Sequence, residues 1–202
     1  VKAFGASDTM EESLCREMGR VEKSQNPIAV RSRSMLQQAM LELLTEQPYG
    51  QITVTALCEH AQLGRKTFYR NYAEKDDILR EYIACLADGF LEKLREQAPF
   101  GDTAFAQTLF AYWKPYADLF RLLEQSGEFR FVQREFERVA ARVGGWFTCP
   151  EAMREDRTFQ RYCASFVSGG CYALLRDWMC GGAVEPVERM TTLFCQIRRL
   201  KA

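Results

Sequence analysis

The chain has 202 residues, of which 47% are hydrophobic and 27% are charged, a balance that is typical of a globular protein and excludes a disordered one. Its 27 basic and 27 acidic side chains cancel, so the net charge does not indicate a nucleic-acid partner. No stretch reaches 18 consecutive apolar residues and no signal peptide opens the chain, so we expect a cytoplasmic protein with no membrane partner.

The eight cysteines do not form a metal-binding or disulfide pattern. No Cys-x-x-Cys pair occurs and His60 is the only histidine, so we predict neither zinc nor another metal. Most of the cysteines fall inside helical apolar patterns, where a free thiol behaves as a small hydrophobic group. We expect reduced core thiols, with redox sensing as the alternative.

The first half of the chain predicts a leader followed by three helices. Residues 1–28 are polar and mixed in charge and predict a loosely ordered leader, with an arm that touches DNA as the alternative. An amphipathic helix is predicted over residues 29–47, and two shorter apolar-periodic pieces follow at 53–61 and 65–72. Neither short piece is stable by itself. Paired across a tight turn, they predict a helix-turn-helix, whose second helix enters the major groove of DNA.

Helical patterns continue to the end of the chain, and no strand pattern appears. Asp76 opens a long helix that runs to about residue 97, and shorter helices are predicted at 103–113, 115–125 and 128–144. The longest apolar segment spans 157–180, and a last helix spans 185–200. We therefore predict an all-α fold, with a three-helix DNA-binding head at residues 29–75 and a helical-bundle domain for ligand binding and dimerisation at residues 76–202.

The stretch ITVTALCEHAQLGRKTFYRNYAEKDDIL, residues 52–79, resembles the DNA-binding signature of the tetracycline-repressor (TetR) family of bacterial regulators. The family usually has glycine where this chain has Gln62, and often Ser, Thr or Asn where it has Gly64. If Gln62 takes a left-handed backbone, the strain costs about 1–2 kcal/mol; otherwise the turn is rearranged around Gly64. The positions that match the family are Thr53, Thr67, Phe68, Tyr69, Tyr72 and Lys75.

The front of the second short helix carries the candidate DNA contacts. Arginine and lysine in such a position can pair with guanine O6 and N7, and threonine can touch a thymine methyl group. Thr53 and Lys75 start the second and fourth helices, where free N–H groups favour a phosphate, and the family resemblance implies the same role. A solvated basic helix start is the alternative. The predicted DNA contacts are Thr53, Arg65, Lys66, Thr67, Tyr69 and Lys75.

Aromatic residues accumulate in the second half of the chain. Most of them must form the core, but helical bundles also place ligand sites between their helices, in largely apolar surroundings with few polar groups. The family resemblance implies that this domain binds a small inducer. The pocket candidates, with plain packing as an equal alternative, are Tyr112, Trp113, Tyr116 and Tyr162.

Residues 162–178 indicate a contact surface. A glycine inside a helix costs about 1 kcal/mol relative to alanine, so adjacent glycines here favour close approach by another helix, either the last helix or a second subunit. The family resemblance implies dimerisation through the last two helices. The segment FVSGGCYALLRDWMCGGAVEPVE, residues 166–188, is also similar to a TetR subgroup related to dihydroxyacetone-kinase regulators. The predicted dimer interface is Phe166, Gly169, Gly170, Ala173, Met190, Phe194 and Ile197.

The sequence contains no arrangement typical of a catalytic site and no phosphate-binding glycine loop, so we predict neither catalytic residues nor a cofactor. We predict a homodimeric transcriptional regulator: a repressor that a small-molecule effector releases from a palindromic site on double-stranded DNA. One alternative is a helical interaction protein that kept the head but lost DNA binding. The other is an enzyme that binds a small molecule.

Overall fold

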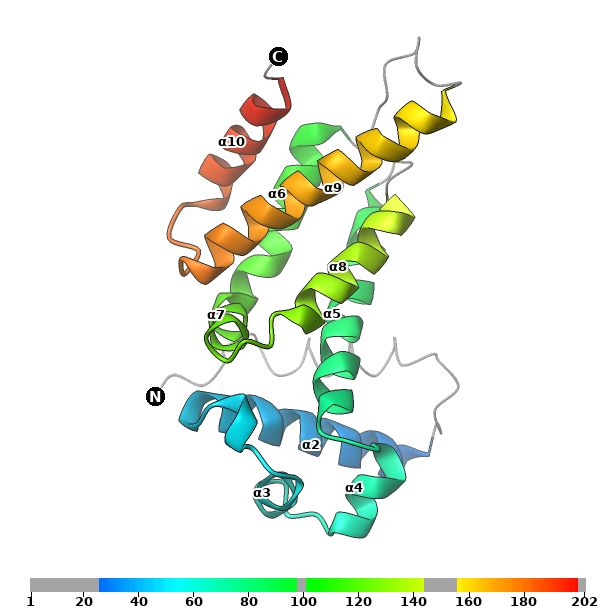
Figure 1. Cartoon of the computed structure of the whole chain (residues 1–202), viewed down its shortest axis with the longest axis vertical. Coiled ribbons are helices and arrows are strands. Elements are labelled where there is room, and N and C mark those ends of the chain that lie inside the picture. Colours follow the sequence, from blue (N-terminus) through cyan, green and yellow to red (C-terminus); the bar gives the residue numbers. More distant parts are fainter. Residues whose placement is uncertain (1–25, 98–100, 144–155, 200–202) are drawn as a thin grey trace. The chain divides into compact units, whose positions relative to one another are not determined.

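The computed structural model describes residues 26–97, 101–143 and 156–199 (Figure 1). The described residues form α-helices and short 3-10 turns and contain no strand, so the predicted all-α class is confirmed. The predicted leader lies almost wholly outside the described residues. In chain order the elements are α2 (Pro27–Glu46), η1 (Tyr49–Gln51), α3 (Val54–His60), α4 (Arg65–Asn71), α5 (Asp76–Glu96), α6 (Asp102–Trp113), η2 (Lys114–Tyr116), α7 (Ala117–Gln125), α8 (Arg130–Val143), α9 (Arg157–Cys180) and α10 (Val187–Arg199).

Packing divides the chain into two units. The first holds the residues up to Gly89 together with Leu122–Phe131, and the second holds Phe90–Arg121 and the residues from Val132 onward. The helices α5, α7 and α8 therefore each begin in one unit and end in the other. The domain boundary between residues 75 and 76 stays a prediction: α5 begins at Asp76, and the first unit continues along it to Gly89.

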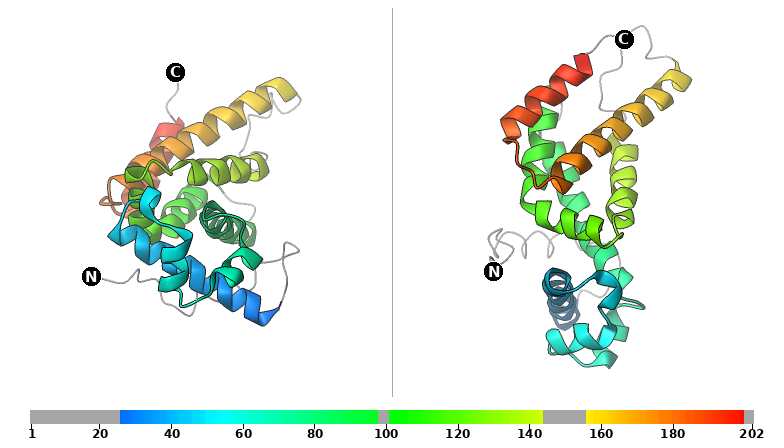
Figure 2. Two further views of the ribbon diagram at one scale, coloured as in Figure 1. Left: turned by 60° about the horizontal axis from the view of Figure 1, so that its bottom comes forward. Right: turned by 60° about the vertical axis from the view of Figure 1, so that its left-hand side comes forward.

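The first unit is built on α2, against which α3 and α4 pack (Figures 1 and 2). α2 begins at Pro27 because the missing N–H of a proline costs nothing in a first turn. The Asn26 side chain caps the helix by accepting a hydrogen bond from the Ile28 amide at 3.0 Å. Apolar side chains from α2, α3, α4 and α5 form the core. Among those fully buried are Leu36, Met40, Leu57, Phe68, Ile78 and Leu79.

The second unit is held together by aromatic contacts between α6, α9 and α10. Phe110 of α6 lies edge-on to Trp178 of α9, with 5.2 Å between ring centroids, and its ring is 6.4 Å from that of Phe194 on α10. At the start of α6, Asp102 forms an ion pair of 3.1 Å with Arg198 near the end of α10. Apolar packing and one ion pair thus fix α10 along α6.

No described helix combines the length and the apolar character that a membrane span requires. The described residues also contain no group of three or more His, Cys, Asp or Glu side chains placed to hold a metal ion. Cys58 and Cys171 are buried free cysteines. Burial raises the pKa of Cys171 to about 12, so this thiol is protonated at neutral pH and unreactive.

The turn between α3 and α4 is built on a left-handed residue that is not glycine. Gln62 has a φ of +53°, whereas Gly64 has an ordinary φ of −74°, so the turn is not rearranged around Gly64. The Leu63 amide donates to the Cys58 carbonyl at 2.9 Å, and the Gln62 amide donates to the Glu59 carbonyl at 3.1 Å. These bonds end α3 in the way that usually places glycine in the left-handed position.

We predict that Gln62→Gly stabilises the protein by about 0.5–1 kcal/mol, because it removes a left-handed strain of about 1–2 kcal/mol and adds some chain entropy to the unfolded state. The measurement is the midpoint of urea unfolding. Gln62→Ala is the matched control, since it shortens the side chain but keeps the strain. An equal gain in both variants would show that the side chain, and not the backbone, is the source of the effect.

Candidate nucleic-acid interface

The helices α3 and α4, here called the reading pair, have Thr53 and Gly64 as their N-cap residues. The Thr53 hydroxyl oxygen accepts a hydrogen bond from the Ala56 amide at 3.1 Å and thereby caps α3. Thr53 itself is exposed, and its hydroxyl proton is not used in this bond. Gly64 precedes α4 without a side-chain cap. The amides of the first turn of α4 are therefore not covered by a capping side chain.

One face of α4 is fixed by burial. Phe68 is fully buried, and its ring lies 6.1 Å from that of the buried Tyr72. Burial raises the pKa of Tyr72 well above its usual range, so its hydroxyl remains protonated. That hydroxyl accepts a hydrogen bond from the Gln37 amide group of α2 at 3.5 Å. The inner face of α4 is thus attached to α2 by both apolar and polar contacts.

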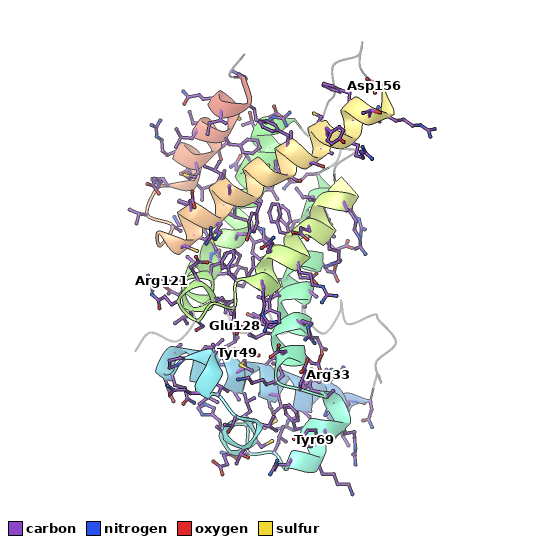
Figure 3. The ribbon with its side chains drawn as sticks, viewed as in Figure 1. Arg33, Tyr49, Tyr69, Arg121, Glu128 and Asp156 are labelled. Atoms are coloured by element: carbon purple, nitrogen blue, oxygen red, sulfur yellow. The ribbon has the colours of Figure 1, made fainter. Side chains whose placement is uncertain are left out.

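The opposite face of α4 is exposed and basic. Arg65, Lys66 and Arg70 are all exposed, and none of them forms an ion pair within the described residues. Tyr69 on the same helix is 55% exposed (Figure 3), with its ring edge-on to Phe68 at 5.2 Å. Thr67 is half-buried. Three unpaired cations and a phenol on one short helix form a surface suited to a polyanion.

Lys75 has a different environment from the other predicted DNA contacts. Its ammonium group donates to the carbonyls of Tyr49 at 2.7 Å and Ile52 at 2.9 Å. It also lies 4.2 Å from the centroid of the Tyr49 ring. Two of its three N–H donors are therefore used within the head, where they hold η1 against the start of α5. A phosphate contact would have to use the remaining donor.

His60 connects α3 to α2 at the back of the reading pair. Its Nε2 lies 2.6 Å from Glu42, which also accepts a hydrogen bond from Gln38 at 2.8 Å. The Gln38 bond, followed by the His60 bond, lowers the pKa of Glu42 below its usual range. A carboxyl group whose pKa is lowered by folding stabilises the folded protein at pH values above its ordinary pKa. This stabilisation is lost as the pH falls through the lowered pKa. His60 therefore has a structural partner and no catalytic one.

In the second unit, three of the four pocket candidates form one cluster of rings, here called the aromatic cluster. The Trp113 ring lies 5.2 Å from Tyr112, 5.9 Å from Tyr116 and 5.6 Å from Phe120, and Phe90 of α5 joins at 5.5 Å from Tyr112. Trp113 is 5% exposed, and its indole N–H has no hydrogen-bond partner among the residues that the structure describes. Buried donors without a partner are rare, and each calls for a specific explanation.

The fourth candidate, Tyr162, lies apart from the aromatic cluster. It is 62% exposed on α9, where its hydroxyl accepts a hydrogen bond from Arg161 at 3.1 Å and its ring lies 4.7 Å from that guanidinium. Among the described residues it makes no ring contact with the cluster. The sequence pattern could not separate Tyr162 from the other three, because a polar-tipped aromatic residue in a helix looks the same whether it faces inward or outward.

The predicted dimer residues fall into two groups. Met190 and Phe194 are buried within their own chain, where Phe194 packs 5.8 Å from Phe105. This burial removes both from the surface that a partner could reach. The other five are exposed, four of them on α9 and Ile197 on α10, with Phe166 at 84% and Ile197 at 52% exposure. The exposed group is Phe166, Gly169, Gly170, Ala173 and Ile197.

Comparison with known proteins identifies the head. Residues 37–82 match the model of the bacterial regulatory proteins of the tetR family, and this range contains the whole reading pair. Over this range the chain is similar to the DNA-binding part of tetR-family regulators. A TetR-like head is also supported by an uncharacterized HTH-type transcriptional regulator, YxbF, of Bacillus subtilis (strain 168), which is 38% identical over 63 residues. That match covers 31% of this chain and 17% of the Bacillus protein.

Two solved structures extend the likeness beyond the TetR-family head. The fatty acid degradation regulator FadR from Bacillus halodurans superposes with a TM-score of 0.62 at 13% identity, covering 87% of this chain and 96% of that one. The dihydroxyacetone kinase operon activator DhaS gives a TM-score of 0.56 at 15% identity, covering 82% and 93%. At such low identity the two superpositions establish a shared fold and nothing further.

One further residue, Arg70, belongs to the candidate DNA surface. Arg70 is exposed on α4, four residues after Lys66, and residues four apart lie on the same side of a helix. That spacing was available in the sequence and could have indicated Arg70. The sequence could not have indicated that Lys75 bonds to two carbonyls that lie 23 and 26 residues earlier in the chain.

We predict that Arg65→Ala and Lys75→Ala fail in different ways. Arg65→Ala should reduce discrimination between operator and random DNA by about 1–3 kcal/mol per half-site and leave stability unchanged, because the side chain is exposed. Lys75→Ala should lower the free energy of unfolding by about 1–3 kcal/mol, because the carbonyls of Tyr49 and Ile52 each lose the hydrogen bond from its ammonium group. Competition gel shifts and urea unfolding measure the two effects.

The salt dependence of binding separates a second role for Lys75 from its structural one. If Lys75 also contacts a phosphate, its removal flattens the slope of log affinity against log salt by about 0.9. An unchanged slope would mean that Lys75 acts only within the head. Loss of stability in Arg65→Ala, with discrimination intact, would contradict the assignment of roles.

Proposed function

We propose that this chain is a repressor that binds a palindromic DNA operator as a homodimer and is released from it by a small-molecule effector. DNA binding is carried by one observation: the exposed, unpaired cations of α4 on the reading pair of a TetR-family head. Such a surface can contact phosphates and base edges together. The exposed phenol of Tyr69 adds a neutral donor for a phosphate oxygen.

Dimerisation is supported by the exposed face of α9. Gly169 and Gly170 meet nothing within 4 Å at the position of an added Cβ atom, so packing within their own chain gives no reason for glycine there. Phe166 lies one turn earlier on the same stripe and is 84% exposed. A second copy related by a two-fold axis would cover Phe166 and let two helix backbones approach at the glycines. Two heads held in this way match a palindromic site.

We predict that Gly170→Leu abolishes the dimer and keeps the fold. The added side chain meets open space within one chain, but it would collide twice with a two-fold partner, and overpacking of this kind costs about 1–3 kcal/mol per site. Light scattering should show a monomer, and circular dichroism should show unchanged helix content. Gly64→Leu, at a glycine that also meets nothing within 4 Å but lies in the reading pair, should stay dimeric. A dimeric Gly170→Leu protein that binds DNA normally would rule out this interface.

An effector site is supported by the unpaired indole N–H of Trp113 inside the aromatic cluster. Rings surrounding one unsatisfied donor provide apolar contact area and one directional contact, which are the features of a small-molecule site. The two solved structures of similar fold are named as a fatty acid degradation regulator and an operon activator. A small metabolite with an apolar body and a hydrogen-bond acceptor is the effector class that fits the cluster.

We predict that Trp113→Phe and Trp178→Phe differ in stability by about 2 kcal/mol, with Trp178→Phe the less stable. Both side chains are buried, so the lost volume is equal. The Trp178 N–H donates to the Glu185 carbonyl at 3.2 Å, so its removal loses a hydrogen bond of about 1 kcal/mol, whereas removal of the Trp113 N–H relieves an unsatisfied donor. Urea unfolding of the two variants measures the difference. Equal losses would mean that the Trp113 donor is satisfied in solution and gives no support for an effector contact.

The experiment that tests the proposed function is selection of genomic DNA fragments on the purified protein, with Arg65→Ala as the control. Recovery of fragments that share an inverted repeat, and their loss with the control variant, is the expected result. Fragments without a shared site, recovered equally by both proteins, would favour a helical interaction protein that has lost specific DNA binding. The genes that flank the recovered sites would indicate which metabolites to try as effectors.

A further inference from the structure

The first turn of α8 makes specific contacts with the head. Arg130 donates to Asp76 at 3.0 Å and to Glu128 at 2.8 Å, and its guanidinium lies 4.5 Å from the centroid of the Phe131 ring. Phe131 is buried and meets the Tyr49 ring edge-on at 6.3 Å. All of these residues belong to the first unit. α8 continues from Phe131 into the second unit at Val132.

Tyr49 is the residue on which these contacts converge. It is 2% exposed, and its hydroxyl donates to the Asp76 carboxylate. Burial and the nearby Asp76 raise the pKa of Tyr49 far above its usual range, so the hydroxyl keeps its proton and acts as a donor at any physiological pH. The neighbouring Asp77 accepts the amides of Ala73 and Glu74 at 2.9 and 3.1 Å. Local capping is thus performed by Asp77, whereas Asp76 contacts Tyr49, Arg130 and, at 3.8 Å, Arg80.

From Tyr49 the contacts continue to the start of the reading pair. Tyr49 opens η1, and its carbonyl and that of Ile52 accept the two hydrogen bonds from Lys75. Ile52 is buried and directly precedes Thr53, the cap of α3. Only three residues separate Tyr49 from Thr53, so a displacement of Tyr49 would also shift the N-cap of α3. Figure 3 labels Tyr49 and Glu128 on the two segments that meet here.

We propose that Arg130 and Phe131 are positioning residues for DNA binding, which act through Tyr49 and Asp76 on the start of α3. This inference rests on the proposed function and adds the route by which a change along α8 reaches the reading pair. Arg130 is the informative member. Its side chain is 60% exposed, and ion pairs of exposed side chains contribute little to global stability. A strong effect of Arg130 on the reading pair would therefore reflect positioning and not overall folding.

The first test needs neither DNA nor effector. Amide hydrogen exchange at Gln51 and Ile52, whose N–H groups donate within η1, is compared in the wild type, Arg130→Ala and Arg95→Ala. Arg95 is the matched control, since it is 53% exposed and, within the described residues, its ion pair is with Glu92 on its own helix. We expect exchange at these amides to be at least about 5-fold faster in Arg130→Ala, which is the lower end of ordinary coupling, and unchanged in the control. Equal exchange in all three proteins would overturn the proposal.

The second test uses a DNA fragment recovered in the genomic selection. Coupling is reciprocal, so fragment binding should slow amide exchange in α8 beyond Val132 in the wild type and in Arg95→Ala, but not in Arg130→Ala. The affinity of Arg130→Ala for the fragment should fall by about 5-fold or more, with partial recovery in Arg130→Lys. Phe131→Leu, which keeps an apolar side chain, should behave like Arg130→Ala.

The outcomes separate this inference from the function on which it rests. If no fragment binds any of the proteins, the proposed function fails, while the exchange of Gln51 and Ile52 still decides whether Arg130 positions η1. If fragments bind and α8 shows no change in exchange, DNA binding stands and the positioning role of Arg130 is refuted. A large drop in the urea midpoint of Arg130→Ala would assign Arg130 to overall stability and refute its positioning role.

Discussion

Burial of Phe68 is the constraint on which the DNA-reading surface depends. α4 has seven residues, and a helix of this length is not stable in water without tertiary contacts. Phe68 and Tyr72 supply these contacts from one side of the helix. Because the inner face of the helix is packed in one orientation, the outer face is oriented as well. The exposure of Arg65, Lys66 and Tyr69 therefore follows from the packing of Phe68 and Tyr72.

The polar contacts around Tyr49 fix the segment before α3, which apolar packing alone would not hold in place. Buried backbone carbonyls and a buried phenol require partners. Lys75, just before α5, donates to the Tyr49 carbonyl, and Asp76, the first residue of α5, accepts the Tyr49 hydroxyl. The residues that precede α3 and those that follow α4 therefore supply each other's hydrogen-bond partners. The reading pair is held at both of its ends by residues adjacent to it in sequence, and its orientation depends on the same groups that contact α8.

The sequence predicted those features that depend on periodicity and local chemistry. Phe68 and Tyr72 stand four residues apart, a spacing that predicts one helix face, and both are buried. The family resemblance gave two alternatives for the turn, and the left-handed backbone of Gln62 is one of them. Features that depend on distant partners were beyond such reasoning. The acceptors of Lys75 lie more than 20 residues earlier, and whether Met190 and Phe194 face a partner or their own α6 cannot be read from an amphipathic pattern. The unsatisfied N–H of Trp113 likewise depends on how the second unit packs and cannot be predicted from the sequence.

The proposed dimer gives the exposed face of α9 a physical reason. A single exposed aromatic residue needs no explanation, but Phe166 shares its stripe with two glycines at which an added Cβ atom would meet nothing within 4 Å in the described part of the chain. Each glycine costs about 1 kcal/mol of helix stability relative to alanine, and a monomer receives nothing in return. A two-fold partner would bury Phe166 and use both glycines for close backbone approach, and the same axis would present two α4 helices to the DNA. The least favourable feature of α9 and the symmetry of a palindromic operator thus have one common explanation.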